Sequence, residues 1–182
     1  MTANVRDADV RDLPALHAIY SHHVLHGFGT FDEVPPSLTA FEEKWRAVVD
    51  AGLPWLVAEG EGEVLGYAYA SIFRPRTGYR YTIEDSVYIR DDQRGHGLGT
   101  ALLRPLISRC EATGARQVVA VIGDSKNTGS IALHRKAGFR EAGTLASVGY
   151  KFGRWVDIVF MQRTLNGGDA VPPTGPGAWR SA

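Results

Sequence analysis

The glycine-rich stretch "DDQRGHGLGT", Asp91 to Thr100, constrains the fold of this chain more than any other. It follows the β-rich run "SVYIR" and precedes a helical pattern that runs from Leu98 to about Thr113. Gly95, Gly97 and Gly99 allow positive φ and let a ligand approach the backbone closely. A helix N-terminus adds unpaired N–H groups and a partial positive charge. The stretch therefore predicts a phosphate-binding turn, with a plain strand-to-helix connection as the alternative.

The spacing of these glycines narrows the kind of phosphate ligand. Dinucleotide-binding domains carry G-x-G-x-x-G at the start of a βαβ unit, with an acidic residue after the next strand. Here the spacing is G-x-G-x-G, deep in the chain, and no acidic residue ends a following strand. The P-loop pattern G-x-x-x-x-G-K-[ST] is absent from the sequence. These differences argue against a Rossmann dinucleotide and against a P-loop nucleotide. They leave a ligand that carries a pyrophosphate of another kind.

The hydrophobic pattern of the rest of the chain alternates between helical and strand periods. It predicts a helix capped by Asp12 that runs to about His26, and a second, opened by a capping box at Thr39–Glu42, that runs to about Ala51. A later helix, "NTGSIALHRKAGF", closes at Gly138. The predicted strands are "WLVAEG", "EVLGYAYASIF", "YRYTIEDSVYIR", "QVVAVIG", "GTLASVGY" and "RWVDIVFMQRTL". The order is roughly β-α-α-β-β-β-α-β-α-β-β, which predicts an α+β (mixed α/β) fold.

Pro105 conflicts with the helix that is predicted after the glycines. Proline inside a helix costs about 3 kcal/mol, because it lacks the N–H and clashes with the preceding turn. The sequence therefore predicts either a kink at Pro105 or a different start for this helix.

Length and composition predict one domain, residues 1–165, followed by a flexible C-terminal tail, residues 166–182, in which Trp179 is a candidate for docking. The chain has 20 basic and 20 acidic residues, which argues against broad binding to nucleic acid or to anionic membranes. One cysteine, Cys110, cannot form an internal disulfide, and we expect it to pack in the core. No apolar run reaches membrane-spanning length and no apolar leader opens the chain, so we expect a cytoplasmic protein.

The segment "RGHGLG", Arg94 to Gly99, fits the R/Q-x-x-G-x-G/A signature of the Gcn5-related N-acetyltransferases (GNAT), and the chain resembles this family from roughly Val5 to Leu165. The segments "PWLVAEGEGEVLGYAYA", "YRYTIEDSVYI", "VVAVIGDSKN" and "VGYKFGRWVDIVFMQ" resemble the phosphinothricin and methionine sulfoximine acetyltransferase branch. The resemblance implies the acyl-CoA N-acyltransferase fold. In this fold a central mixed, mostly antiparallel twisted sheet carries helices on both faces.

The resemblance also implies acetyl-CoA as co-substrate, bound in a V-shaped gap beside the central strand, and no metal. The backbone of Val87, Tyr88 and Ile89 would pair with the pantetheine arm. The residues implied to hold the rest of acetyl-CoA are Arg94, Gly95, His96, Gly97, Leu98, Gly99, Thr100, Asn127 and Lys136.

Acetyl transfer to an amine needs a proton acceptor, because a protonated amine has no lone pair. Glu84 stands at the family's base position, three residues before "VYI", among apolar neighbours that would raise its pKa. The alternative is a strand carboxylate that pairs with Arg80 or faces water. His134 stands where many family members have the tyrosine that protonates the leaving thiolate, and we expect it to act as the acid or, alternatively, to be packed in its helix.

The loop "FRPRTGYRY" gathers arginines whose planar guanidinium suits a carboxylate or phosphinate. The branch resemblance implies that Thr77, Gly78 and Tyr79 touch substrate. The candidate substrate-binding residues are Arg74, Thr77, Gly78, Tyr79, Arg80 and, from "HGFGTFDEVPP", Phe31. The alternatives are a solvated loop and a core position for Phe31.

The predicted function is transfer of acetyl from acetyl-CoA to the α-amino group of an amino acid of the phosphinothricin, methionine sulfoximine or methionine sulfone type. The alternatives are a GNAT enzyme for another amine or a protein N-terminus, and a CoA-binding sensor without turnover. The resemblance implies a homodimer. His22 and His26 have a spacing that can bind metal, but no acidic partner or cysteine completes a set, so no metal site is predicted.

Overall fold

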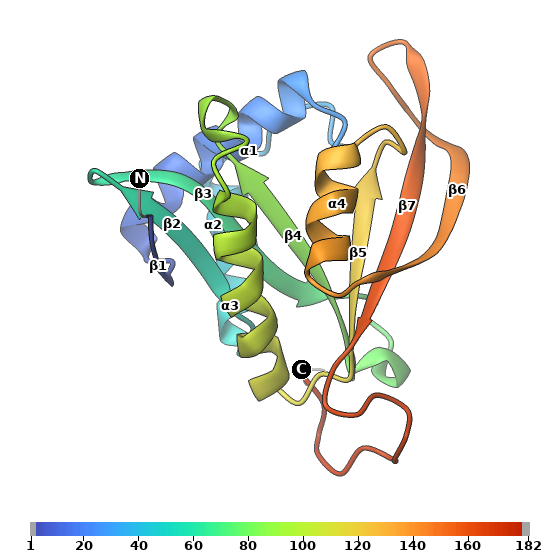
Figure 1. Cartoon of the computed structure of the whole chain (residues 1–182). Helices are drawn as coiled ribbons and strands as arrows, with labels where there is room; N and C mark the ends of the chain where they lie inside the picture. Colours follow the sequence, from blue (N-terminus) through green and yellow to red (C-terminus); the bar gives the residue numbers. More distant parts are fainter. Residues whose placement is uncertain (1–2, 180–182) are drawn as a thin grey trace.

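The computed structural model describes residues 3–179, and within them seven strands form one sheet with helices on both faces (Figure 1). The strand order is β1-β2-β3-β4-β5-β7-β6. Neighbouring strands are antiparallel except β4 and β5, which are parallel, so the predicted mixed and mostly antiparallel sheet is confirmed. The strands are β1 (Asn4–Asp7), β2 (Trp55–Gly60), β3 (Glu63–Ile72), β4 (Thr82–Ile89), β5 (Gln117–Gly123), β6 (Arg140–Lys151) and β7 (Arg154–Thr164).

Two helices cover each face of the sheet (Figure 1). On one face lie α1 (Leu13–His26) and α2 (Leu38–Asp50), and on the other lie α3 (Leu98–Ala112) and α4 (Thr128–Lys136). Each of the longer helices turns an apolar stripe toward the sheet, because apolar residues recur every three or four positions. Helix α1 buries Leu16 and Val24, and α3 buries Leu102 and Leu106.

The start of α2 differs from the sequence prediction. The helix begins at Leu38, and its N-cap is Ser37, whose side chain accepts a hydrogen bond from the backbone N–H of Ala40 at 3.1 Å. The predicted capping box at Thr39–Glu42 is therefore wrong by two residues, because "SLTA" offers a serine cap before the threonine is reached.

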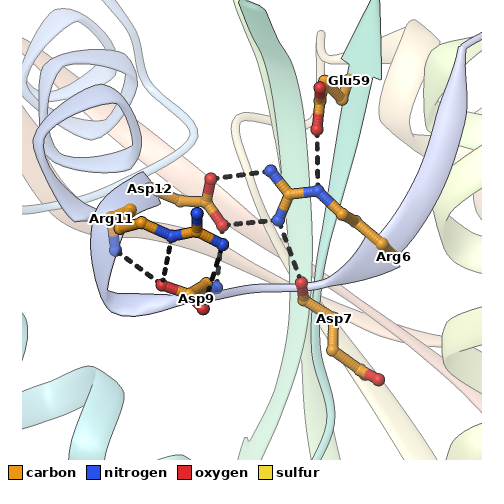
Figure 2. A network of polar contacts seen from close by, with 6 residues as sticks. All are labelled: Arg6, Asp7, Asp9, Arg11, Asp12 and Glu59. Atoms are coloured by element: carbon orange, nitrogen blue, oxygen red, sulfur yellow. Dashed lines mark hydrogen bonds and ion pairs between the residues drawn. The ribbon is translucent and has the colours of Figure 1, made fainter. Parts of the chain in front are cut away.

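Asp12 precedes α1 as predicted, but its side chain does not cap that helix. Its carboxylate accepts from the backbone N–H of Asp9 at 2.7 Å and closes a capping box around the short 3-10 helix Val10–Asp12. Arg6 of β1 donates to both oxygens of Asp12 and to Glu59 of β2 (Figure 2). The arginine thus joins the edge strand, its neighbour and the start of α1.

Pro105 lies inside α3, which nonetheless begins at Leu98 as predicted. The proline removes one hydrogen bond to the preceding turn. Burial of Leu102, Leu103 and Leu106, each 0 % exposed, offsets this loss.

The chain after β7 packs back onto the domain as far as Trp179. Trp179 is only 3 % exposed, and the backbone N–H of Ala178 donates to the carbonyl of Arg80 at 2.8 Å. Gly177 has φ +103° and lies so close to Arg80 that a Cβ there would stand 2.6 Å from its carbonyl oxygen. The tail is docked rather than free over these residues, and Trp179 is the docking residue that the sequence indicated.

The β6–β7 hairpin, at one end of the sheet, carries exposed apolar side chains on both strands and in its turn. Leu145, Val148, Tyr150, Phe152 and Trp155 are each 49 to 62 % exposed. We call these five residues the hairpin patch. Strand β6 pairs only with β7 within the described chain, so its outer edge is open.

Candidate active site

Strands β4 and β5 pair along only part of their length. The parallel ladder joins Thr82–Asp85 to Gln117–Ala120, and beyond Asp85 the two strands diverge (Figure 1). The backbone from Ser86 to Ile89 therefore has no partner on the β5 side. A cavity of about 1170 Å³ opens where the strands part. This is the V-shaped gap that the sequence resemblance implied.

The glycine-rich turn stands at the wall of this cavity. Gly95 and Gly97 have φ of +80° and +82°, and Gly97 is the N-cap of α3. A Cβ at either glycine would meet no atom within 4 Å, so backbone conformation rather than crowding requires glycine here. The N–H groups of the first turn of α3, from Leu98 to Thr100, precede the first intrahelical bond, which Ala101 makes to Gly97 at 3.1 Å. The turn has the geometry of an anion site.

Eleven of the twelve residues predicted to bind acetyl-CoA line the cavity, and His96 is the exception. His96 is exposed and is not part of the cavity lining. Arg94 lines the cavity and also pairs with Asp91 at 3.1 Å. Asn127 caps α4, because its side-chain oxygen accepts from the N–H of Ser130 at 3.2 Å.

One backbone group of β4, the strand predicted to pair with pantetheine, already has a hydrogen-bond partner within the protein. The carbonyl of Ile89 accepts a hydrogen bond from Nε2 of His23 at 2.9 Å. Burial lowers the pKa of His23, so its ring is neutral near pH 7 and Nε2 carries the donated proton. The N–H of Arg90 donates to Leu65 of β3 at 2.9 Å, so alternation along the strand turns the backbone of Tyr88 toward β3 and that of Val87 and Ile89 toward the gap. Of the three predicted residues, Val87 is left with both backbone groups free on the β5 side.

Glu84 lies half-buried in the cavity on the face of the sheet covered by α1 and α2. The β3–β4 register pairs it with Ser71 and pairs Ser86 with Tyr69, so these side chains share one face. Burial raises the pKa of Glu84 to about 7; Arg74 and Lys44 oppose the rise, and Asp85 adds to it. A carboxyl with this pKa exchanges a proton readily near neutral pH. The alternative pairing with Arg80 is not formed.

His134 lines the cavity, and both of its ring nitrogens have hydrogen-bond partners. It is 4 % exposed, its Nδ1 donates to the carbonyl of Ser130 at 2.7 Å, and its Nε2 lies 2.9 Å from Oδ2 of Asp85. Burial opposes the charged ring, but the charge and hydrogen bond of Asp85 outweigh it, so the pKa of His134 is raised. The other oxygen of Asp85 is buried without a partner among residues 3–179. A proton is thus shared within a buried pair.

The predicted substrate loop does not form the cavity wall. Thr77–Tyr79 is an exposed 3-10 helix, and Thr77, Gly78, Tyr79 and Arg80 are absent from the lining. Arg80 instead stacks on Tyr81 and contacts the docked tail. Arg74 stacks on Phe73 and is the one arginine of this loop close enough to Glu84 to affect its pKa.

Phe31 belongs to a segment, Gly27–Phe31, that does line the cavity. Two glycines make room for this wall. A Cβ at Gly123 would stand 2.1 Å from the carbonyl oxygen of Phe28, and a Cβ at Gly149 would stand 1.9 Å from the ring of Phe31. We call residues 27–31 the wall segment.

A buried lysine fastens the wall segment to β6. Lys151 is 1 % exposed, and its Nζ donates to the carbonyl of Thr30 at 2.8 Å. From the other side, the hydroxyl of Tyr20 lies 3.1 Å from Oγ1 of Thr30 and donates to Asp32 at 2.6 Å. The wall is thus held by both α1 and the hairpin.

Comparisons with known proteins agree with this geometry. The model of the Acetyltransferase (GNAT) family matches residues 16–139, the span from α1 to the end of α4. The chain belongs to the GNAT acetyltransferases. It is 56 % identical over 162 residues to a phosphinothricin N-acetyltransferase of Alcaligenes faecalis, covering 89 % of this chain and 82 % of that protein.

Two further relatives of this GNAT acetyltransferase cover it almost completely. An L-methionine sulfoximine/L-methionine sulfone acetyltransferase of Pseudomonas paraeruginosa is 46 % identical over 94 % of this chain and 100 % of its own length. The crystal structure of a GNAT phosphinothricin acetyltransferase from Sinorhizobium meliloti, in complex with AcCoA, is 46 % identical. Its TM-score is 0.93, and the match covers 97 % of this chain and 96 % of that one. The predicted family and fold are confirmed.

Sequence reasoning missed several residues of the GNAT cavity. Lys44, Tyr20 and Tyr69 line it, and Asp85 pairs with His134. Strand alternation from Glu84 could have found Asp85 as a carboxylate on the opposite face. Lys44 carries no comparable signal, because only the tertiary packing of α2 brings it beside β4.

Within residues 3–179, no three histidine, cysteine or carboxylate residues lie close enough to hold a metal ion. No helix in this described range is both long and apolar enough to span a membrane. Cys110 is buried in α3, and burial raises the pKa of its thiol.

Proposed function

We propose that this GNAT acetyltransferase transfers acetyl from acetyl-CoA to the α-amino group of an amino acid of the phosphinothricin, methionine sulfoximine or methionine sulfone type. One observation carries the proposal: Glu84, with a pKa of about 7, stands in the cavity at the point where β4 parts from β5. The substrate class is supported by the names of the Alcaligenes faecalis and Pseudomonas paraeruginosa relatives.

The residues of the cavity fit acetyl-CoA, which supplies an acetyl group activated as a thioester. The N–H groups of the glycine turn and the guanidinium of Arg94 bind its pyrophosphate. The free backbone edge of β4 at Val87 holds the pantetheine arm, and a free N–H on this edge polarises the acetyl carbonyl. Asn127 and Lys136 reach the far arm from α4.

Glu84 accepts the proton that the acceptor ammonium must lose before its nitrogen can attack. The half-buried position keeps the carboxyl a good base near neutral pH. On the other face of β4, the buried pair of Asp85 and His134 also lines the cavity, and His134 supplies the proton that the departing thiolate of CoA needs.

The decisive experiment is a thiol-release assay with acetyl-CoA and a panel of amines. We expect turnover with phosphinothricin, L-methionine sulfoximine and L-methionine sulfone. Turnover only with peptides would overturn the substrate class, and tight binding of CoA without release of thiol would indicate a sensor module.

A protein N-terminus is the second candidate acceptor. The crystal structure of a ribosomal-protein-alanine N-acetyltransferase from Brucella melitensis is 42 % identical with a TM-score of 0.86, over 89 % of this chain and 99 % of that one. Peptides that begin with alanine therefore belong in the same panel.

A homodimer in the cytoplasm completes the proposal, with no nucleic-acid or membrane partner. The hairpin patch, five exposed apolar residues on the β6–β7 hairpin whose outer strand has an open edge, supports self-association. The free thiol of Cys110 suits a reducing compartment, and zero net charge suits a small-molecule enzyme. Light scattering of the wild type and of Trp155→Arg tests the dimer, which the substitution is expected to weaken.

A further inference from the structure

Lys44 projects from α2 into the cavity that contains Glu84. Its Nζ lies 5.1 Å from the ring centroid of Tyr69 and 5.5 Å from that of Tyr20. Both tyrosines are almost fully buried, so they form a fixed platform under a solvent-accessible ammonium group. Attraction between the cation and the two ring faces limits where the ammonium can stand.

This ammonium makes no hydrogen bond or ion pair with any residue from 3 to 179, although carboxylates are close by. Two carboxylates of neighbouring segments are engaged by other partners. Asp32 accepts from the hydroxyl of Tyr20 at 2.6 Å, and Glu42 pairs with Arg46 one turn further along α2. Glu84 feels the charge of Lys44 without pairing with it.

Arg74, which follows β3, is likewise a cation without a carboxylate partner. Its guanidinium stacks on Phe73 and donates to the carbonyl of that residue, and no carboxylate of the described chain pairs with it. Two unpaired cations therefore flank one base. Of the two, Lys44 lines the cavity, where a cation without a carboxylate partner favours an anion supplied by the ligand.

We propose that Lys44 binds the α-carboxylate of the acceptor amino acid and so selects α-amino acids over simple amines. The inference rests on the proposed function and extends it to a residue of α2. An α-amino acid carries its ammonium and its carboxylate on one carbon. Glu84 takes a proton from the first group while Lys44 holds the second, and the nitrogen is oriented by both contacts.

The test crosses a change in the enzyme with a matching change in the substrate. Thiol release is measured for the wild type, Lys44→Met and Lys44→Arg, each with L-methionine sulfoximine and with its α-carboxamide, which lacks the anion. We expect Lys44→Met to lower kcat/KM for the acid by about tenfold or more and for the carboxamide by less than about twofold, because one charge-assisted contact is lost.

Two further results follow if Lys44 binds the carboxylate. The loss appears in KM for the acceptor while KM for acetyl-CoA stays constant, and Lys44→Arg keeps most of the activity on the acid. Arg46→Met, on the same helix but paired with Glu42 outside the cavity, serves as the control and changes neither substrate.

Equal loss on the acid and the carboxamide, or no loss on either, overturns the role of Lys44. A wild-type enzyme that acetylates neither compound overturns the proposed substrate class and this inference with it. The two failures are distinguishable, because the first is seen in the variant and the second in the wild type.

Discussion

Glu84 and Asp85 are adjacent on β4, yet their carboxyl groups lie on opposite faces of the sheet. Glu84 opens into the cavity under α1 and α2, whereas Asp85 pairs with His134 of α4. Strand alternation divides the two, and the end of the β4–β5 ladder at Asp85 places both at the apex of the gap. The strand thus brings a proton acceptor and a buried ion pair to one point from two sides.

Replacement of Glu84 by glutamine removes the proton acceptor with little change in volume. At pH 7 we expect kcat/KM to fall by on the order of 10² or more, as for other general bases. In the wild type, kcat/KM should rise with pH through about 7, where the Glu84 carboxyl ionises. At pH 9 the loss should shrink, because more of the amine is already deprotonated. A pH series of thiol release measures both effects, and a variant as active as wild type at pH 7 would remove Glu84 as the base.

Asp85→Asn keeps the shape of the buried pair but removes its charge. Breaking such a pair costs on the order of 3 kcal/mol. The folded-state pKa of His134 is raised, so the stabilisation is fully present below the unfolded pKa and is lost as pH rises through the folded one. Urea unfolding at pH 6 and pH 9 measures the free energy of unfolding of wild type and variant, and we expect their difference to be larger at pH 6. An equal difference at both pH values would contradict the raised pKa of His134.

Lys151→Met removes the donor that holds the wall segment to β6. Loss of the bond to Thr30 leaves a buried carbonyl unsatisfied, at a cost of about 1–3 kcal/mol. We expect KM for the amino acid to rise several-fold while KM for acetyl-CoA is unchanged, because the glycine turn is built on other elements. Arg140→Met, an exposed change on the same strand, is the control. Equal changes in the two KM values would assign Lys151 a general structural role.

Gly97→Val forces a branched side chain into φ +82° at the N-cap of α3. The turn must shift, and we expect the Kd for acetyl-CoA to rise more than about tenfold while the fold persists. Gly78→Ala is the matched control, since Gly78 has open space and no positive φ. Calorimetric titration with CoA measures both, and tight binding by the Gly97 variant would contradict a role for the turn in holding pyrophosphate.

Much of the fold was predictable because hydrophobic period and glycine placement are local signals. The strand–turn–helix unit around Gly97 needed only a few neighbouring residues, and α3 began where the pattern indicated despite Pro105. Glu84 and the cofactor wall followed from the family signature. The orientation of His134 could not be predicted in this way, because it is set by a hydrogen bond to Asp85, 49 residues earlier in the chain. Thr77, Gly78 and Tyr79 were assigned to substrate from the family resemblance and Arg80 from its guanidinium; the four lie outside the cavity lining, and Arg80 contacts the tail.

The docking of the tail bears on how the protein emerges during synthesis. Residues 175–179 lie against Arg80 and Tyr81, immediately before the strand that carries Glu84. Translation delivers these last neighbours about a hundred residues after the loop itself. On the ribosome, the approach to β4 therefore stays uncovered until residues 175–179 have left the exit tunnel, and a stop codon before them would leave it uncovered.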